Sequence, residues 1–198
     1  MNLIKKILIL TFSFATLFVL TPQKSHAVIL DLTGGGNGFI DAAYFQWMDS
    51  QSTGTGVIDS FVRLQNRESE EGYNTSGRPL TNWPDVNTSP VFTRDLTLGS
   101  VPIVNIGGTD YREFLLDINQ TSNNPLLSLD QIKIYLGSSG GLTTATLSDL
   151  GTLVYNLDAS ANNWIKLDYS LNSGSGSGDM LAYIPNSVFI GPSQYVYF

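Results

Sequence analysis

The 198-residue sequence contains no cysteine and only one histidine, His26. Without cysteine the fold cannot use disulfide bonds, and zinc and most transition-metal sites lose their preferred ligands. Nucleophilic catalysis of the Ser-His-Asp or Cys-His type also needs a histidine, and His26 lies in a segment that we expect to be removed. The folded chain therefore has to be stabilised by its apolar core, and any enzymatic chemistry would have to come from carboxylates.

The N-terminus carries the only long apolar run. Lys5 and Lys6 precede an apolar stretch at residues 7–20, and Ser25-His26-Ala27 supplies small residues at a cleavage point. This order predicts a secretory signal peptide at residues 1–27, cleaved after Ala27. An uncleaved anchor is the alternative, but the run is short of the roughly 20 residues that a spanning helix needs.

Residues 28–198 are predicted to form a single β-sandwich domain, about 170 residues being enough to bury a sizeable core. Removal of Lys5, Lys6 and Lys24 leaves seven cationic residues against 17 acidic ones, a net charge of −10. An acidic surface of this kind disfavours nucleic acid and anionic membranes as partners. It suits an extracellular protein and is compatible with cation binding.

Alternation of apolar and polar residues dominates this region. It predicts antiparallel strands that are buried on one face, and the strand-like segments are 28–32, 57–64, 91–98, 101–106, 109–120, 131–136, 152–157, 164–171, 180–184 and 188–190. Gly-, Asn- and Ser-rich turns separate these segments. About 8–10 strands at this spacing indicate an all-β, antiparallel, jelly-roll-like sandwich.

Three other stretches are less regular. Residues 41–50 fit a helical turn or a strand, and "TLSDLGTL" fits one short turn. The stretch "LNSGSGSGDML" at residues 171–181 is too short for a domain linker and predicts a hairpin connection within one domain. The strand-like end "SQYVYF" predicts that the domain is truncated at its C-terminal end; a natural last strand that pairs inside a sheet is the alternative.

Carboxylates leave two kinds of site open. A glycan-active enzyme would need two of them, with Glu68, Glu70, Glu71 and Glu113 as candidates, but the first three lie in a polar run typical of a solvated loop. We therefore expect no catalytic residues. No cofactor is expected, although a structural calcium ion with Asp179 as one oxygen ligand is compatible with the composition.

Sugar binding requires exposed aromatic rings beside polar groups. Trp83, in the Pro-containing stretch "GRPLTNWPDVN", and Tyr73 are the candidate sugar contacts. Packing of Trp83 at the edge of the sandwich core is the alternative. A carbohydrate-binding module, with or without calcium, is therefore one hypothesis for the function.

Several stretches resemble one family of exported proteins. They are "GTGVIDSFVRLQ", "EEGYNTSGR", "YREFLLDINQ", "SLDQIKIYL", "LNSGSGSGDML" and "YVYF". In this order they resemble the body of secreted bacterial proteins that carry a PEP-CTERM sorting tail. The tail itself, a Pro-Glu-Pro motif with an apolar helix and a basic cluster, is not in this sequence.

The resemblance implies an uncharacterised bacterial protein that is secreted or held at the cell surface. Its implied partner is extracellular polysaccharide, in the exopolysaccharide or biofilm matrix. Membrane contact is expected only through the signal peptide or a missing C-terminal sorting tail. The main hypothesis is therefore a non-enzymatic extracellular β-sandwich protein; the alternatives are the carbohydrate-binding module and, less favoured, a carboxylate-dependent glycan-active enzyme.

Overall fold

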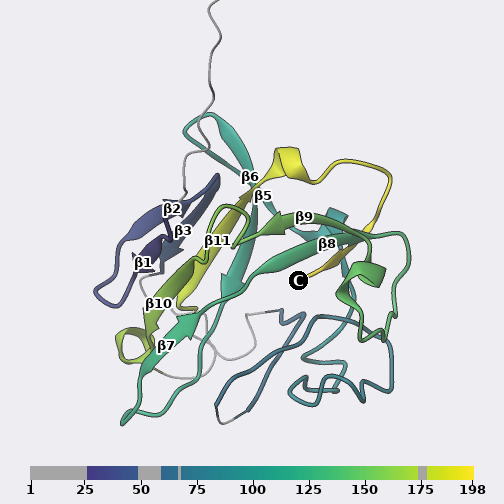
Figure 1. Ribbon diagram of the computed structural model, residues 1–198, viewed down its shortest axis with the longest axis horizontal. Helices are drawn as coiled ribbons and strands as arrows, with labels where there is room; N and C mark the ends of the chain where they lie inside the picture. The colour runs from purple at the N-terminus through teal and green to yellow at the C-terminus, as the bar shows by residue number, and fades with distance from the viewer. Residues whose placement is uncertain (1–25, 49–58, 67, 174–177) are drawn as a thin grey trace, which may run out of the picture.

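The structure is a computed structural model that describes residues 26–48, 59–66, 68–173 and 178–198. Within these ranges the regular structure consists of short β-strands and four 3₁₀ turns (Figure 1). No helix among the described residues is long and apolar enough to cross a membrane.

The strands form three sheets. The first has the order β1-β10-β7, the second β2-β3-β11-β6-β5 and the third β4-β12-β8-β9. The bounds are β1 Ile29–Asp31, β2 Asn37–Ile40, β3 Ala43–Trp47, β4 Leu96–Thr97, β5 Ile103–Ile106, β6 Thr109–Leu116, β7 Leu126–Leu129, β8 Lys133–Gly137, β9 Thr152–Asn156, β10 Trp164–Asp168, β11 Met180–Pro185 and β12 Tyr195–Tyr197.

One apolar core lies between these sheets. It takes Ile165 from the first sheet, Phe45 and Ile184 from the second, and Ile134 and Val196 from the third, and each of the five is fully buried. This main cluster receives side chains from all three sheets, and a smaller buried cluster, to which the third sheet contributes Tyr135 and Tyr197, lies apart from it. The predicted all-β sandwich is confirmed, with one difference: β1 pairs with β10 in parallel, whereas every other strand pair is antiparallel.

The alternation identified several strands in the correct phase. Phe114, Ile134 and Ile165 are buried, and all three fall on the faces that the pattern assigns to the interior. Of residues 41–50, the described part, 41–48, contains the turn and second strand of a hairpin. Strands β2 and β3 pair through Ile40 and Ala43, and Asp41 takes a positive φ of 53° at the turn. "TLSDLGTL" contains the expected short turn, η2 at Leu147–Leu150.

The strand predicted at 57–64 is wrong for its described part, residues 59–64, which form only an isolated bridge from Leu64 to Val86. Side chains take the hydrogen bonds that a ladder would use. The Arg94 guanidinium donates to Ser60 O, and Arg63 N donates to Thr93 Oγ1. These side-chain contacts compete successfully with sheet formation, and the alternation pattern does not register them.

Two further strand predictions are wrong in extent. Of residues 91–98 only Leu96–Thr97 form a strand, because Phe92 N and Thr93 N donate to Ser89 O in a turn. Residues 188–190 form no strand; η4 (Asn186–Val188) ends there. The hairpin predicted across residues 171–181 is also wrong, because β10 and β11 belong to different sheets, while residues 174–177 lie outside the described ranges.

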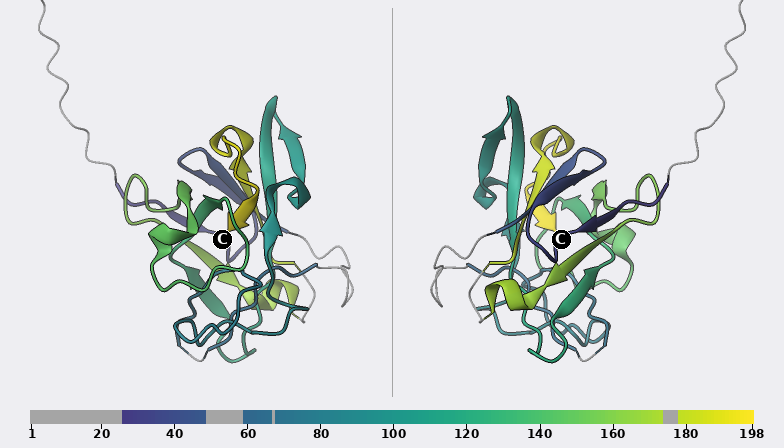
Figure 2. Two further views of the ribbon diagram at one scale, coloured as in Figure 1. Left: turned by 90° about the vertical axis from the view of Figure 1, so that its right-hand side faces the viewer. Right: turned by 90° about the vertical axis from the view of Figure 1, so that its left-hand side faces the viewer.

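Residues 59–66 and 68–95 consist of irregular loops along one side of the sheets, at the bottom of Figure 1. On the opposite side, the β5–β6 hairpin extends beyond the other strands (Figure 2). Its two-residue turn is Gly107-Gly108, and both glycines have positive φ, the conformation that such a turn requires. The irregular loops and the sheets are joined by specific side chains.

Asn74 is the clearest of these joints. It is fully buried, its Nδ2 donates to Val196 O at 2.8 Å, and its Oδ1 accepts from Phe198 N at 2.6 Å. Strand β12 itself lies between β4 and β8. The Asn74 amide thus donates to the β12 backbone and accepts from the residue that directly follows β12, as a neighbouring strand would.

We expect Asn74→Ala to lower the free energy of unfolding by about 2 kcal/mol or more, because it leaves buried backbone groups of β12 without partners. Urea unfolding would measure the loss. Asn119→Ala is the matched control: Asn119 is exposed, and surface substitutions usually stay within about 0.5 kcal/mol. Equal stability of the two variants would contradict the role assigned to Asn74.

Candidate functional site

Asp179 is the buried carboxylate of the fold. It lies directly before β11 and is 2% exposed. Its backbone N donates to Leu116 O and its carbonyl accepts from Met48 N, so the residue extends the pairing of β11 with its two neighbours. Its Oδ2 accepts from Ile118 N at 2.7 Å. Asp179 therefore holds the ends of three adjacent segments together.

The surroundings of Asp179 favour its neutral form. Burial, together with the negative charge of Asp117, raises the pKa of the Asp179 carboxyl to about 7, and the hydrogen bond from Ile118 opposes this only in part. Asp179 Oδ1 and Asn172 Oδ1 are both buried and have no hydrogen-bond partner among the described residues. Nδ2 of the same Asn172 donates to Gly178 O, next to Asp179.

The predicted calcium contact at Asp179 stays a prediction. The described residues contain no group of three or more acidic, histidine or cysteine side chains placed to hold a metal ion. Calcium takes six to eight oxygen ligands, so an ion here would depend on Asp179 Oδ1, Asn172 Oδ1 and neighbouring carbonyls. A proton on Asp179 would compete with such an ion below about pH 7.

The two predicted sugar contacts come together, but inside the molecule. Tyr73 and Trp83 meet edge to face at 5.5 Å between ring centroids, and Tyr73 also packs on Tyr197. Both polar ends bind one carbonyl: Tyr73 Oη and Trp83 Nε1 each donate to Thr144 O at 3.0 Å.

This packing removes Tyr73 as a sugar platform. Its ring is 3% exposed, and a sugar stacks only on an aromatic face that solvent can reach. Trp83 is half-buried and packs against the same aromatic cluster, which fits its alternative role at the edge of the core. Sugar contact by Trp83 stays a prediction.

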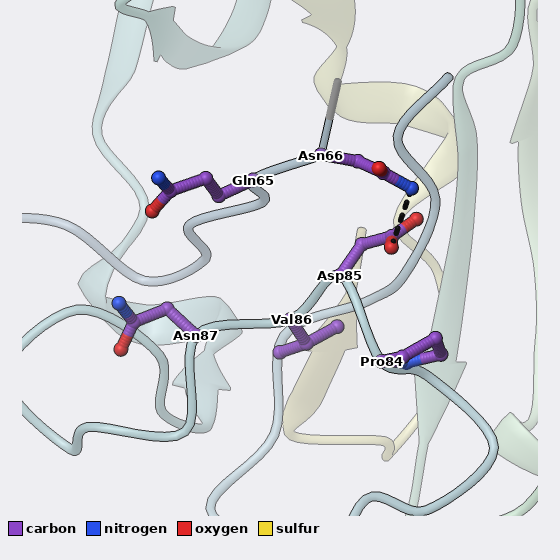
Figure 3. A pocket seen from close by; sticks show the side chains of 6 residues that line it. All are labelled: Gln65, Asn66, Pro84, Asp85, Val86 and Asn87. Carbon is purple, nitrogen blue, oxygen red and sulfur yellow. Dashed lines mark hydrogen bonds between the residues drawn. The ribbon is translucent and has the colours of Figure 1, made fainter. Parts of the chain in front are cut away.

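A polar hollow that the sequence did not indicate lies beside Trp83 in the chain (Figure 3). We call it the amide hollow; it has a volume of about 460 Å³ and is lined by Gln65, Asn66, Pro84, Asp85, Val86 and Asn87. Two short segments form it. Gln65 N donates to Asp85 O, and Asn87 N donates to Arg63 O, so residues 63–65 and 85–87 run side by side.

Asp85 fixes the rim of the amide hollow. Its Oδ1 accepts from Asn66 Nδ2 at 2.9 Å, the dashed contact in Figure 3, and its Oδ2 accepts from Glu71 N at 3.1 Å. The Gln65 amide, by contrast, has no hydrogen bond to any described residue and is exposed. Gln65 and Asn87 extend toward the same side in Figure 3, although Asn87 Oδ1 already accepts from Ser89 N at 3.0 Å.

The amide hollow could not be predicted from the sequence because its halves are about twenty residues apart and meet through tertiary hydrogen bonds of the backbone and of Asp85. The run "NWPDVN" contains the residues of one half of the hollow, but its composition points only to Trp83 as a ligand contact. The candidate carboxylates do not form a pair across a hollow. Glu68, Glu70 and Glu71 are exposed, while Glu113 hydrogen-bonds Tyr183 and helps to raise the pKa of that phenol to about 12.

Comparisons with protein-family models, with curated proteins and with solved structures each found no match to this chain. The site therefore has to be interpreted from its own geometry.

The raised pKa of Asp179 predicts a pH dependence of stability. An unfolded aspartate ionises near pH 4 and folded Asp179 near 7, so between these values the folded state holds the extra proton. The free energy of unfolding should then fall as pH rises from 5 to 8. Asp179→Asn keeps an acceptor for Ile118 N but carries no charge, so we expect it to reduce this fall by about 2 kcal/mol.

Urea unfolding at pH 5 and pH 8 would measure the effect, with Glu68→Gln as the control at an exposed carboxylate. An unchanged pH dependence in Asp179→Asn would show that Asp179 ionises normally. In the same samples we expect calcium to change the melting temperature little; a large rise that a chelator reverses would show a bound ion.

Proposed function

We propose that the chain is an exported, non-enzymatic β-sandwich protein that acts outside the cell, at the surface or in the exopolysaccharide matrix, and contacts glycans through the amide hollow. The observation that carries the proposal is the cluster of carboxamides around a fixed rim. An amide offers two donors and one acceptor oxygen, a combination that matches the hydroxyl groups of a sugar.

The rim of the amide hollow is held in place by hydrogen bonds within the protein. Asp85 holds Asn66 and Glu71 in place through its two oxygens, so the rim is ordered before a ligand arrives. A preorganised rim lowers the entropy lost on binding. Pro84 and Val86 add apolar surface next to the polar groups, an arrangement that suits the mixed character of a sugar ring.

We propose a binding protein and not an enzyme because of the number of carboxylates that line the amide hollow. Glycoside hydrolysis needs two of them on either side of the bond that is broken. The amide hollow is lined by one carboxylate, Asp85, and both of its oxygens already accept hydrogen bonds from the protein. This geometry supports glycan contact without turnover.

Export is the second part of the proposal, and residues 1–27 support it. When the full chain is produced in a secreting bacterium, we expect the recovered protein to begin at Val28, as measured by intact mass. Ala27→Arg should block this cleavage because signal peptidase needs a small residue there. Recovery of an uncut chain from the wild type would contradict the proposal.

Glycan binding can be tested on an array of bacterial and plant polysaccharides. We expect Gln65→Ala to weaken binding about tenfold, since a hydrogen bond to a ligand contributes about 1–1.5 kcal/mol. Asn123→Ala, which removes an exposed amide away from the hollow, is the matched control and should bind like the wild type. Binding that survives Gln65→Ala unchanged, or release of sugars from a bound glycan, would contradict the proposal.

A further inference from the structure

Arg112 is a half-buried cation without an acidic partner in the described part of the chain. The ion pairs found there join Arg94 to Asp59 and Lys166 to Asp31, and neither includes Arg112. The chain as a whole has 17 acidic residues against ten Lys and Arg. In so acidic a protein, a sheltered guanidinium that is not neutralised by a carboxylate is unexpected on structural grounds alone.

The protein binds one side of this guanidinium firmly. Nη1 donates to Leu98 O at 2.8 Å and to Val101 O at 2.7 Å, and Nε donates to Asn186 Oδ1 at 2.9 Å. These three contacts fix the plane of the group between β6, η1 (Leu98–Ser100) and η4. All three acceptors are neutral, so they orient the guanidinium without cancelling its charge.

Nη2 is left over. It has no hydrogen bond to any described residue, and Arg112 lines a pocket of about 510 Å³ that no acidic side chain enters. The volume lies in the range of about 300–1,000 Å³ that is usual for small-molecule sites. The other side chains that matter here are Thr97, Pro192, Ser193 and Gln194, which approach from the loop before β12 and from β4.

We propose that the Arg112 pocket binds the carboxylate of an acidic saccharide, a uronic acid, with Nη2 of Arg112 donating to the carboxylate. A guanidinium held in a fixed plane is the side chain best suited to carboxylates, and its charge-assisted hydrogen bonds are about twice as strong as neutral ones. This binding site is separate from the amide hollow and goes beyond the proposed function.

The other groups that line the Arg112 pocket favour a sugar acid as the ligand. Hydroxyl and amide groups of Thr97, Ser193 and Gln194 match sugar hydroxyls, and Pro192 supplies an apolar face. A single positive charge balances a carboxylate, whereas a phosphate dianion would leave a negative charge near an already acidic protein. Burial lowers the pKa of the Arg112 guanidinium, consistent with a charge that is poorly solvated until an anion binds.

The test uses the full chain as purified after export, titrated with D-glucuronate and followed by NMR chemical shifts. We expect millimolar binding, the order usual for one charged contact on a monosaccharide. D-glucose, which has the same ring without the carboxylate, should bind at least tenfold more weakly. Raising the salt concentration should weaken glucuronate binding, because the contact is between charges.

Two variants at Ser193 make the assignment specific without touching the contacts that Arg112 makes with the protein. Ser193→Asp places a carboxylate in the pocket and should weaken glucuronate binding at least tenfold. Ser193→Asn has nearly the same shape as Ser193→Asp but no charge, so it should bind glucuronate at least tenfold more tightly than Ser193→Asp does. Both variants should unfold at similar urea concentrations, since Ser193 is half-buried and its side chain makes no hydrogen bond to a described residue.

Several outcomes would overturn the inference. They are no shift change with glucuronate, equal binding of glucose, or equal affinity of wild type and Ser193→Asp. Tighter binding of inorganic sulfate, or of a short peptide with a free C-terminal carboxylate, would assign the pocket to another anion. Gln65→Ala should leave glucuronate binding intact, so failure of this pocket and failure of the amide hollow can be told apart.

Discussion

The main apolar core, which all three sheets share, is the constraint on which the rest of the structure depends. With no cysteine in the chain, nothing covalent ties the sheets together. Strand β11 is central to this arrangement: it pairs with β3 and β6, and five of its six residues are buried. Asp179 extends this pairing by one residue and bonds Ile118 N as well. The buried carboxylate therefore belongs to the framework, and its unusual ionisation follows from that position.

Outside the sheets, polar side chains form the hydrogen bonds that neighbouring strands form within a sheet. Asn74 bonds the backbone of β12, Arg94 bonds Ser60 O, and Asp85 joins two loop segments. Such clamps let a long irregular segment stay close to the core without regular structure of its own. Each of the two polar hollows lies beside such clamps and also has one group, the Gln65 amide or Nη2 of Arg112, without a hydrogen bond to a described residue.

Several strands could be predicted from the sequence because apolar and polar residues alternate along them. Contacts made by single side chains could not be predicted in this way. The alternation in residues 109–116, 132–136 and 164–168 marks strands whose inward residues are buried, as expected. The same alternation at residues 59–64 produced no strand, because Arg94 and Thr93 took its backbone groups. Trp83 and Tyr73 are each predicted as a sugar contact, yet their rings pack on each other. The roles of Arg112 and Gln65 cannot be predicted, since nothing local in the sequence distinguishes an unpaired arginine or an exposed amide.

Strand β1 has a consequence for the order of assembly. It is the first strand among the described residues, but its partner β10 begins at Trp164, and Val28 N donates to Asn163 Oδ1, 135 positions later. A chain that leaves the ribosome or crosses a membrane from its N-terminus must therefore keep Ile29–Asp31 unpaired until most of the domain has followed. Closure of this edge belongs to the last stage of folding, because long loops must be closed before such distant contacts form. The segment next to the proposed cleavage point thus stays unpaired for as long as the chain is still emerging.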